Sequence, residues 1–185
     1  MRLFLAIELP SDVRDHLGRV QEALKPVASK ASWTRVENLH LTLKFLGEVS
    51  DADAAQVCEK LKCVAVGAPI ELCAAGIECF PLRGPVRVIG AAMTGDVERL
   101  GELHAQIEEA CAASGFAREP RAYRPHATLA RARVPMPGSS RDRMSERTRQ
   151  LWPGPRMEAT EFVLMHSQLH PKGSRYTPVA RFGIW

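Results

Sequence analysis

Two histidines of this 185-residue chain lie in closely similar short contexts, each two residues before a threonine. His40 and Thr42 occur in "NLHLTLKFLG" (38–47), and His126 and Thr128 occur in "RPHATLAR" (124–131). Imidazole exchanges protons near neutral pH, and hydroxyl groups donate hydrogen bonds to anionic oxygens. Two imidazoles and two hydroxyls around one point could therefore protonate a leaving oxygen and activate an attacking one on opposite sides of a phosphorus atom.

Both motifs lie in sequence that is typical of a half-buried strand. In a strand, residues i and i+2 point to the same face. His40 and Thr42 then share one face and the leucines at 39, 41 and 43 share the other, while Ala127 and Leu129 oppose the second pair. A single H-x-T motif occurs by chance, and a lone strand histidine is usually structural. Two copies in the same kind of context favour the catalytic interpretation.

Arginines are concentrated in residues 118–149. This segment holds nine arginines against three acidic residues, a balance of 9 − 3 = +6, which exceeds the +4 of the whole chain. Guanidinium groups bind phosphate oxygens in a two-pronged manner. Arg131 follows the second motif along its strand and is the preferred phosphate contact, with Arg124 as the second. A solvated loop and helix face would give the same excess, so charge alone leaves both interpretations open.

The apolar pattern predicts the elements that must position these residues. Strands are expected at 2–9, 39–46 and 121–133, and helices at 11–24, about 51–64 and 96–115. A β-rich stretch with a turn is expected at 70–93, a loop with a short polar helix at 134–148, and two strands joined around "HPKGSRY" within 156–185. The two histidine strands form a faint internal echo, but the two halves otherwise align poorly.

Composition excludes several classes of protein. The chain is 45% hydrophobic and 25% charged, as in a globular protein, and no apolar run approaches the ~20 residues that span a bilayer. The start reads as a strand and not as a signal peptide, so we expect a cytoplasmic protein. Five cysteines without C-x-x-C spacing predict reduced thiols and no zinc site. His166 and His170 lack an evident third ligand, so no metal is expected.

The motifs and their surroundings resemble the 2H phosphoesterase superfamily, and within it the bacterial and archaeal RNA 2′,3′-cyclic phosphodiesterases, historically called 2′-5′ RNA ligases. The resemblance is carried by "RLFLAIELP", "WTRVENLHLTLKFLGEV", "YRPHATLARAR" and "FVLMHSQLHPKGSRYTPVARF". It spans essentially the whole chain, although residues 50–115 contribute little. It implies an α+β, bilobal fold within a single domain, 1–185, in which two antiparallel sheets with outer helices flank a central cleft.

The same resemblance implies the reaction. A 2′,3′-cyclic phosphate at an RNA end is opened without metal or cofactor to a 2′-phosphomonoester, with slow ligation as the reverse reaction. His40 is implied as the proton donor and His126 as the proton acceptor, while Thr42 and Thr128 hold phosphate oxygens. A monomer is expected. The same chemistry on 2′-5′ oligonucleotides or small cyclic nucleotides stays open, as does an RNA-binding module without catalysis, which the two intact motifs disfavour.

Overall fold

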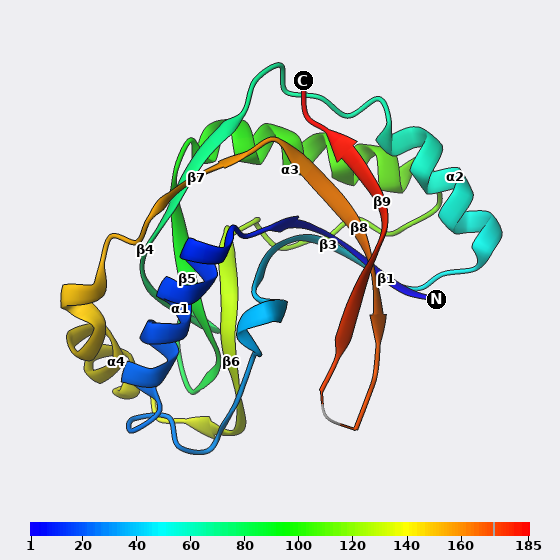
Figure 1. The fold of residues 1–185 in the computed structure, drawn as a ribbon. Coiled ribbons are helices and arrows are strands. Elements are labelled where there is room, and N and C mark those ends of the chain that lie inside the picture. The colour runs from blue at the N-terminus through cyan, green and yellow to red at the C-terminus, as the bar shows by residue number, and fades with distance from the viewer. Residues whose placement is uncertain (172) are drawn as a thin grey trace.

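The computed structural model describes residues 1–171 and 173–185, which form an antiparallel sheet with helices packed against it (Figure 1). The strands of the described chain are β1 (Arg2–Glu8), β2 (Ala31–Trp33), β3 (His40–Glu48), β4 (Ile70–Phe80), β5 (Val86–Gly95), β6 (His126–Met136), β7 (Arg156–Ala159), β8 (Glu161–Gln168) and β9 (Arg175–Gly183). Its helices are α1 (Ser11–Leu24), α2 (Asp51–Leu61), α3 (Val97–Ala112) and α4 (Ser140–Thr148), with 3-10 turns η1 (Val36–Asn38) and η2 (Arg149–Leu151). No helix in the described part of the chain is long and apolar enough to span a membrane.

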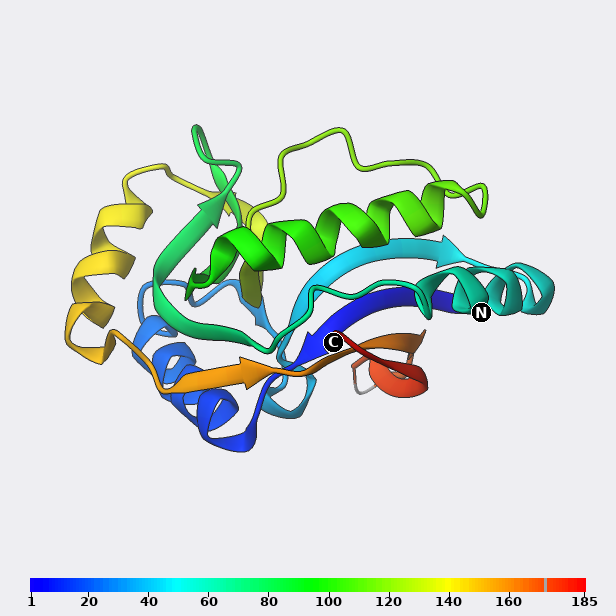
Figure 2. The ribbon, with the colours of Figure 1, turned by 90° about the horizontal axis from the view of Figure 1, so that it is seen from above.

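The helices form where apolar residues recur at helical spacing, and they bury that face. In α1 the stripe is Val13, Leu17, Val20 and Leu24, and all four are fully buried, as the periodicity predicts. In α3 the corresponding stripe contains Leu100, Leu103, Ile107 and Cys111. Figure 2 shows α3 lying along the outer side of the curled sheet, where it contacts α2, β3 and β4.

The expectation of two separate sheets is wrong. The strands form one continuous, strongly curled sheet in the order β7-β4-β5-β6-β3-β1-β8-β9, with β2 also paired to β6. The two halves are joined because β3 and β6 pair antiparallel at Leu41 and Ala127. Both of these residues are fully buried, so the apolar layer is continuous across the junction and the sheet has no break there.

Three further details differ from the expectation. The strand expected at 121–133 begins at His126 and continues to Met136, because prolines at 120 and 125 cannot donate to a ladder. Strand β2 was not anticipated, and 156–185 contains three strands instead of two, since β7 adds a short edge to β4. The turn expected around "HPKGSRY" includes Lys172, which lies outside the described residues.

Candidate active site

The two H-x-T motifs meet at the junction of the two halves of the sheet. His40 is the first residue of β3 and His126 the first residue of β6. The antiparallel pair Leu41–Ala127 lies between them. Continuing this register by one residue on either side sets His40 opposite Thr128 and Thr42 opposite His126. Because Leu41 and Ala127 point into the core, the two imidazoles and two hydroxyls lie together on the opposite face.

Each motif is followed by a β-bulge at the same position. In β3, Thr42 pairs with Ala6 but Lys44 pairs with Leu5, which leaves Leu43 as the extra residue. In β6, Thr128 pairs with Gly90 but Ala130 pairs with Ile89, so that Leu129 is extra. A bulge shifts the alternation of side chains by one residue. The resemblance between the two halves therefore extends from the motif to the backbone irregularity after it.

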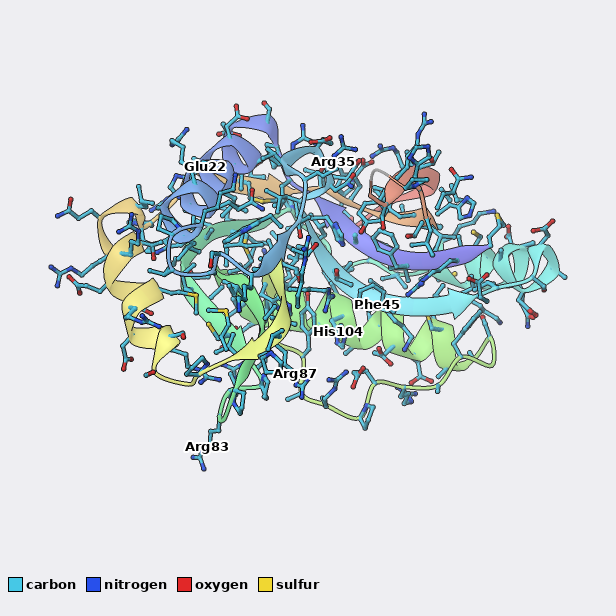
Figure 3. The ribbon with its side chains drawn as sticks, turned by 90° about the horizontal axis from the view of Figure 1, so that it is seen from below. Glu22, Arg35, Phe45, Arg83, Arg87 and His104 are labelled. Carbon is cyan, nitrogen blue, oxygen red and sulfur yellow. The ribbon has the colours of Figure 1, made fainter. Side chains whose placement is uncertain are left out.

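The second bulge returns Arg131 to the face of His126 and Thr128. In a regular strand, a residue five positions after His126 would point to the opposite face. Here Leu129 and Ala130 are both fully buried, and Arg131 is exposed. The equivalent residue after the first motif is Phe45, whose ring is 65% exposed and visible on β3 in Figure 3.

Each imidazole is held by a hydrogen bond of the same kind, to the main-chain carbonyl two residues before it. His40 Nδ1 lies 2.7 Å from the carbonyl oxygen of Asn38, and His126 Nδ1 lies 2.8 Å from the carbonyl oxygen of Arg124. A carbonyl oxygen can only accept, so Nδ1 carries the hydrogen and donates it in each case. The neutral imidazoles then have an unprotonated Nε2, which is the nitrogen left to exchange protons with a substrate.

The walls around the two histidines differ. The ring of His40 packs against Phe4 at 4.9 Å and against Tyr176 of β9 at 5.3 Å between centroids. The ring of His126 packs against Phe80 of β4 at 4.4 Å and lies over Gly90 of β5. A Cβ atom at Gly90 would come 3.0 Å from His126 Cδ2, so the absence of a side chain there gives the imidazole its place.

Burial and charge determine how readily each histidine takes up a proton. Desolvation lowers the pKa of His40 most, the bond to the Asn38 carbonyl opposes that shift, and the charge of His126 lowers it further. Desolvation also lowers the pKa of His126, and Arg131 and Arg124 act in the same direction, while Glu78 and the bond to the Arg124 carbonyl raise it. The charge of His126 therefore acts on His40, and the carboxylate of Glu78 acts on His126.

Many arginines of the 118–149 segment are bound to other protein groups. Arg118 pairs with Glu109, Arg121 with Glu119, Arg124 with Glu78 and Arg149 with Glu146, while Arg141 and Arg147 donate to backbone carbonyls. The guanidinium groups of Arg131 and Arg133 make no hydrogen bond or ion pair with any described residue. The charge excess of this segment therefore leaves few arginines uncommitted, and Arg131 is the one beside the histidines.

A hollow of about 470 Å³ opens next to His40. It lies between the segment around Arg35 and Asn38 and the β8–β9 hairpin, and its lining includes Arg175 and Tyr176. Figure 3 shows Arg35 beside that hairpin. Asn38 and Tyr176 also contact His40, so the hollow adjoins the histidine pair. It is basic overall, although Glu37 lies 3.2 Å from Arg35.

Sequence reasoning placed the motif residues but missed their surroundings. Phe80, Gly90 and Glu78 come from β4 and β5, in a region without a motif, and only the fold brings them to His126. Asn38 could have been found, because it stands two residues before His40 as Arg124 stands two before His126. Within the described residues, no group of three or more histidine, cysteine or acidic side chains is placed to hold a metal ion.

Comparison with known proteins gives a consistent result. A family model described as "LigT like Phosphoesterase" matches residues 7–90 and 94–176, so that each matched stretch contains one H-x-T motif. An RNA 2′,3′-cyclic phosphodiesterase of Methanothermobacter thermautotrophicus is 30% identical over 100% of this chain and 99% of its own. The enzyme of the same name from Thermus thermophilus is 32% identical over 100% and 90%.

Solved structures agree with the sequence comparison. The crystal structure of Escherichia coli LigT complexed with 3′-AMP superposes with a TM-score of 0.78 at 27% identity, covering 99% of this chain and 97% of that one. The crystal structure of a Thermus thermophilus protein, TT0787, superposes with a TM-score of 0.73 at 29% identity, over 100% and 98%. With its motifs, its fold and its full-length relatives in agreement, the chain belongs to the LigT-like phosphoesterase family of enzymes.

Proposed function

We propose that this protein hydrolyses 2′,3′-cyclic phosphodiester ends of RNA to 2′-phosphomonoesters, without a metal ion, by general acid–base catalysis with His40 and His126. The observation that carries the proposal is the antiparallel pairing at Leu41–Ala127, which gathers both histidines and both threonines on one face. All four groups come from one chain, which supports the proposal that the protein acts as a monomer with a single domain, 1–185.

In the proposed reaction, the unprotonated Nε2 of His126 takes a proton from water as the water oxygen forms a bond to phosphorus. The bond from phosphorus to the 3′ oxygen breaks, and protonated His40 donates its Nε2 hydrogen to that oxygen. Thr42 and Thr128 donate hydrogen bonds to the non-bridging oxygens, and Arg131 offsets their negative charge. The same sequence of steps, with a 5′-hydroxyl in place of water as the attacking group, would give 2′-5′ ligation.

Protonation of the donor depends on the substrate. Both histidines have lowered pKa values in the free protein, so near pH 7 the imidazoles are mostly neutral. A bound phosphodiester carries a negative charge, and a nearby opposite charge favours the protonated imidazole. Substrate binding therefore favours the protonated form of His40, which is the form that can act as the donor.

The preference for an RNA end over a small cyclic nucleotide rests on the surface beside the histidines. The hollow next to His40 has room for more than the reacting phosphate and contains Arg35 and Arg175, which can contact backbone phosphates. The exposed ring of Phe45 offers a surface on which a base can stack. Arg124 is a second RNA contact in this proposal, with its guanidinium half exposed and shared with Glu78.

The experiment that tests the proposal uses an RNA oligomer ending in a 2′,3′-cyclic phosphate, in the presence of EDTA. Wild-type protein is expected to hydrolyse it, and His40→Ala and His126→Ala are expected to lose about 10²–10⁴ in rate each while still binding the oligomer. Loss of activity in EDTA would contradict the reaction class, and near-normal turnover by either variant would contradict the mechanism. A threefold or smaller difference in kcat/KM between the oligomer and a cyclic mononucleotide would favour the small substrate.

A further inference from the structure

The carbonyl group that orients His126 belongs to a residue whose side chain is anchored elsewhere. Arg124 accepts the Nδ1 hydrogen of His126 on its carbonyl oxygen, at 2.8 Å. Its guanidinium binds Glu78 of β4 through Nε, at 2.7 Å, and through a terminal nitrogen as well. Arg124 therefore links Glu78, which binds its side chain, to the imidazole, which binds its main chain.

His40 is oriented by a similar arrangement, but the groups that take part in it are neutral. Asn38 accepts the Nδ1 hydrogen of His40 on its carbonyl oxygen, at 2.7 Å. Its side-chain amide donates to the carbonyl oxygen of Ser174, just before β9, at 2.7 Å. In each half of the molecule, the residue two before the histidine orients the ring with its main chain, and its side chain is bound to a segment distant in sequence.

Glu78 is well placed to serve as this anchor. Its side chain is only 15% exposed although it bears a charge, and it lies on a paired strand, opposite Gly90 of β5. Phe80, two residues further along β4, contacts the ring of His126. Arg124, by contrast, lies in the irregular segment before β6, one residue before Pro125, whose carbonyl accepts a bond from the Met93 amide of β5, at 3.0 Å. The rigid strand β4 thus supplies a fixed point for the side chain of Arg124.

We propose that Glu78 is a positioning residue for His126. By holding Arg124, Glu78 keeps the Arg124 carbonyl oxygen in place. That oxygen maintains a hydrogen on Nδ1 of His126 and so leaves Nε2 as the proton-exchanging atom. Its carboxylate also balances charge, since the groups facing His126 are Glu78 from β4, Arg124 and Arg131 from its own segment and strand, and His40 from β3. The catalytic consequence, though not the geometry, rests on the function proposed above.

The removal of the carboxylate should change turnover more than binding. Glu78→Gln keeps the size of the side chain but loses the charge-assisted bonds to Arg124. At metal sites, loss of a group that orients a histidine ring costs about 10- to 100-fold. We expect kcat to fall here by a similar factor, while KM changes less than about threefold. The pH profile should also move to lower pH, because three positively charged or ionisable neighbours then face His126 without a carboxylate.

The test combines kinetics with ¹⁵N NMR of the imidazole nitrogens in the complete protein. Wild-type His126 is expected to show the Nδ1-protonated form when neutral, and Glu78→Gln and Arg124→Gln are both expected to show a mixture of the two tautomers. Glu71→Gln, an exposed glutamate on the same strand, is the matched control and should resemble wild type. Glu78→Asp, which retains the charge, should recover part of kcat.

The outcomes separate this proposal from the proposed function. If Glu78→Gln retains the wild-type tautomer and kcat within twofold, the positioning role is overturned. A rise in KM alone would also overturn it, because Glu78 would then only direct Arg124 toward RNA. If wild-type protein shows no phosphodiesterase activity, the function fails, but the tautomer measurement still decides whether Glu78 orients His126. If Glu78→Gln does not fold, Arg124→Gln provides the same two measurements.

Discussion

Replacing Lys44 by methionine is expected to destabilise the protein by about 3–5 kcal/mol, because it leaves a buried carboxylate without its partner. Lys44 belongs to β3 but points into the core as a result of the bulge at Leu43. Its ammonium group donates to both carboxylate oxygens of Glu108 on α3, at 2.8 and 2.9 Å, and to the carbonyl of Ala117, at 2.8 Å. The two side chains are 4% and 9% exposed.

The magnitude follows from what remains after the substitution. In the Lys44→Met variant, the partners that Glu108 retains among the described residues are the amide of Glu119, at 3.2 Å, and His104, at 3.8 Å. Neither replaces two short bonds from an ammonium group. Replacing both partners, in Lys44→Met with Glu108→Leu, removes the charge and its desolvation together. Such double replacements are often neutral or stabilising by about 1–4 kcal/mol, so the double variant should be at least as stable as wild type.

The assay is urea denaturation of wild type, both single variants and the double variant. With slopes of about 1–3 kcal/mol/M, Lys44→Met should lower the midpoint by at least about 1 M. Lys62→Met is the control, because Lys62 pairs with Glu59 on the surface, where solvent screens the pair and its loss should change stability little. A cost below about 1 kcal/mol for Lys44→Met, or a double variant as unstable as the sum of the singles, would show that the buried carboxylate does not depend on Lys44.

Three further predictions concern activity. The lowered pKa values of His40 and His126 place the maximum of kcat/KM below pH 6.5. The bound substrate anion should shift the alkaline limb of the kcat profile to higher pH. An alkaline limb of kcat/KM above pH 7.5 would contradict this prediction. Gly90→Ala should reduce kcat about 10- to 100-fold by displacing His126, whereas Gly101→Ala, with open space around it, should leave kcat unchanged. Arg131→Ala should lower kcat/KM about 10- to 100-fold through loss of a charged hydrogen bond to phosphate. Arg83, at the β4–β5 hairpin tip (Figure 3), is the control, and an equal effect from Arg83→Ala would indicate that Arg131 acts only through nonspecific charge attraction.

The elements that position the motifs could be predicted because their signals are local. The periodicity of α1 and α3 and the alternation in β1 and β3 appear in consecutive residues. The continuity of the sheet could not be predicted in this way, because it depends on one pairing, Leu41 with Ala127, between residues far apart in sequence. The sequence of each strand is equally compatible with a strand at the edge of a separate sheet and with a strand paired on both sides within one continuous sheet.

The same distinction holds at the candidate site. His40 and His126 stood out because their motif is repeated, and the face they share follows from the period of a strand. The bulges at Leu43 and Leu129 were not predicted, although two consecutive apolar residues before Arg131 are compatible with a bulge there. The partners Glu78, from β4, and Tyr176, from β9, carry no local signal, since only tertiary pairing brings them to the histidines.

The proposed mechanism is tested most directly by identifying the product of ring opening by ³¹P NMR, in EDTA, for wild type and both histidine variants. Departure of the 3′ oxygen, assisted by His40 and His126, predicts that wild type converts an RNA 2′,3′-cyclic phosphate end to the 2′-phosphomonoester alone, and that neither alanine variant gives appreciable product in the same time. A 3′-phosphomonoester, or comparable product from either alanine variant, would contradict the two-histidine mechanism.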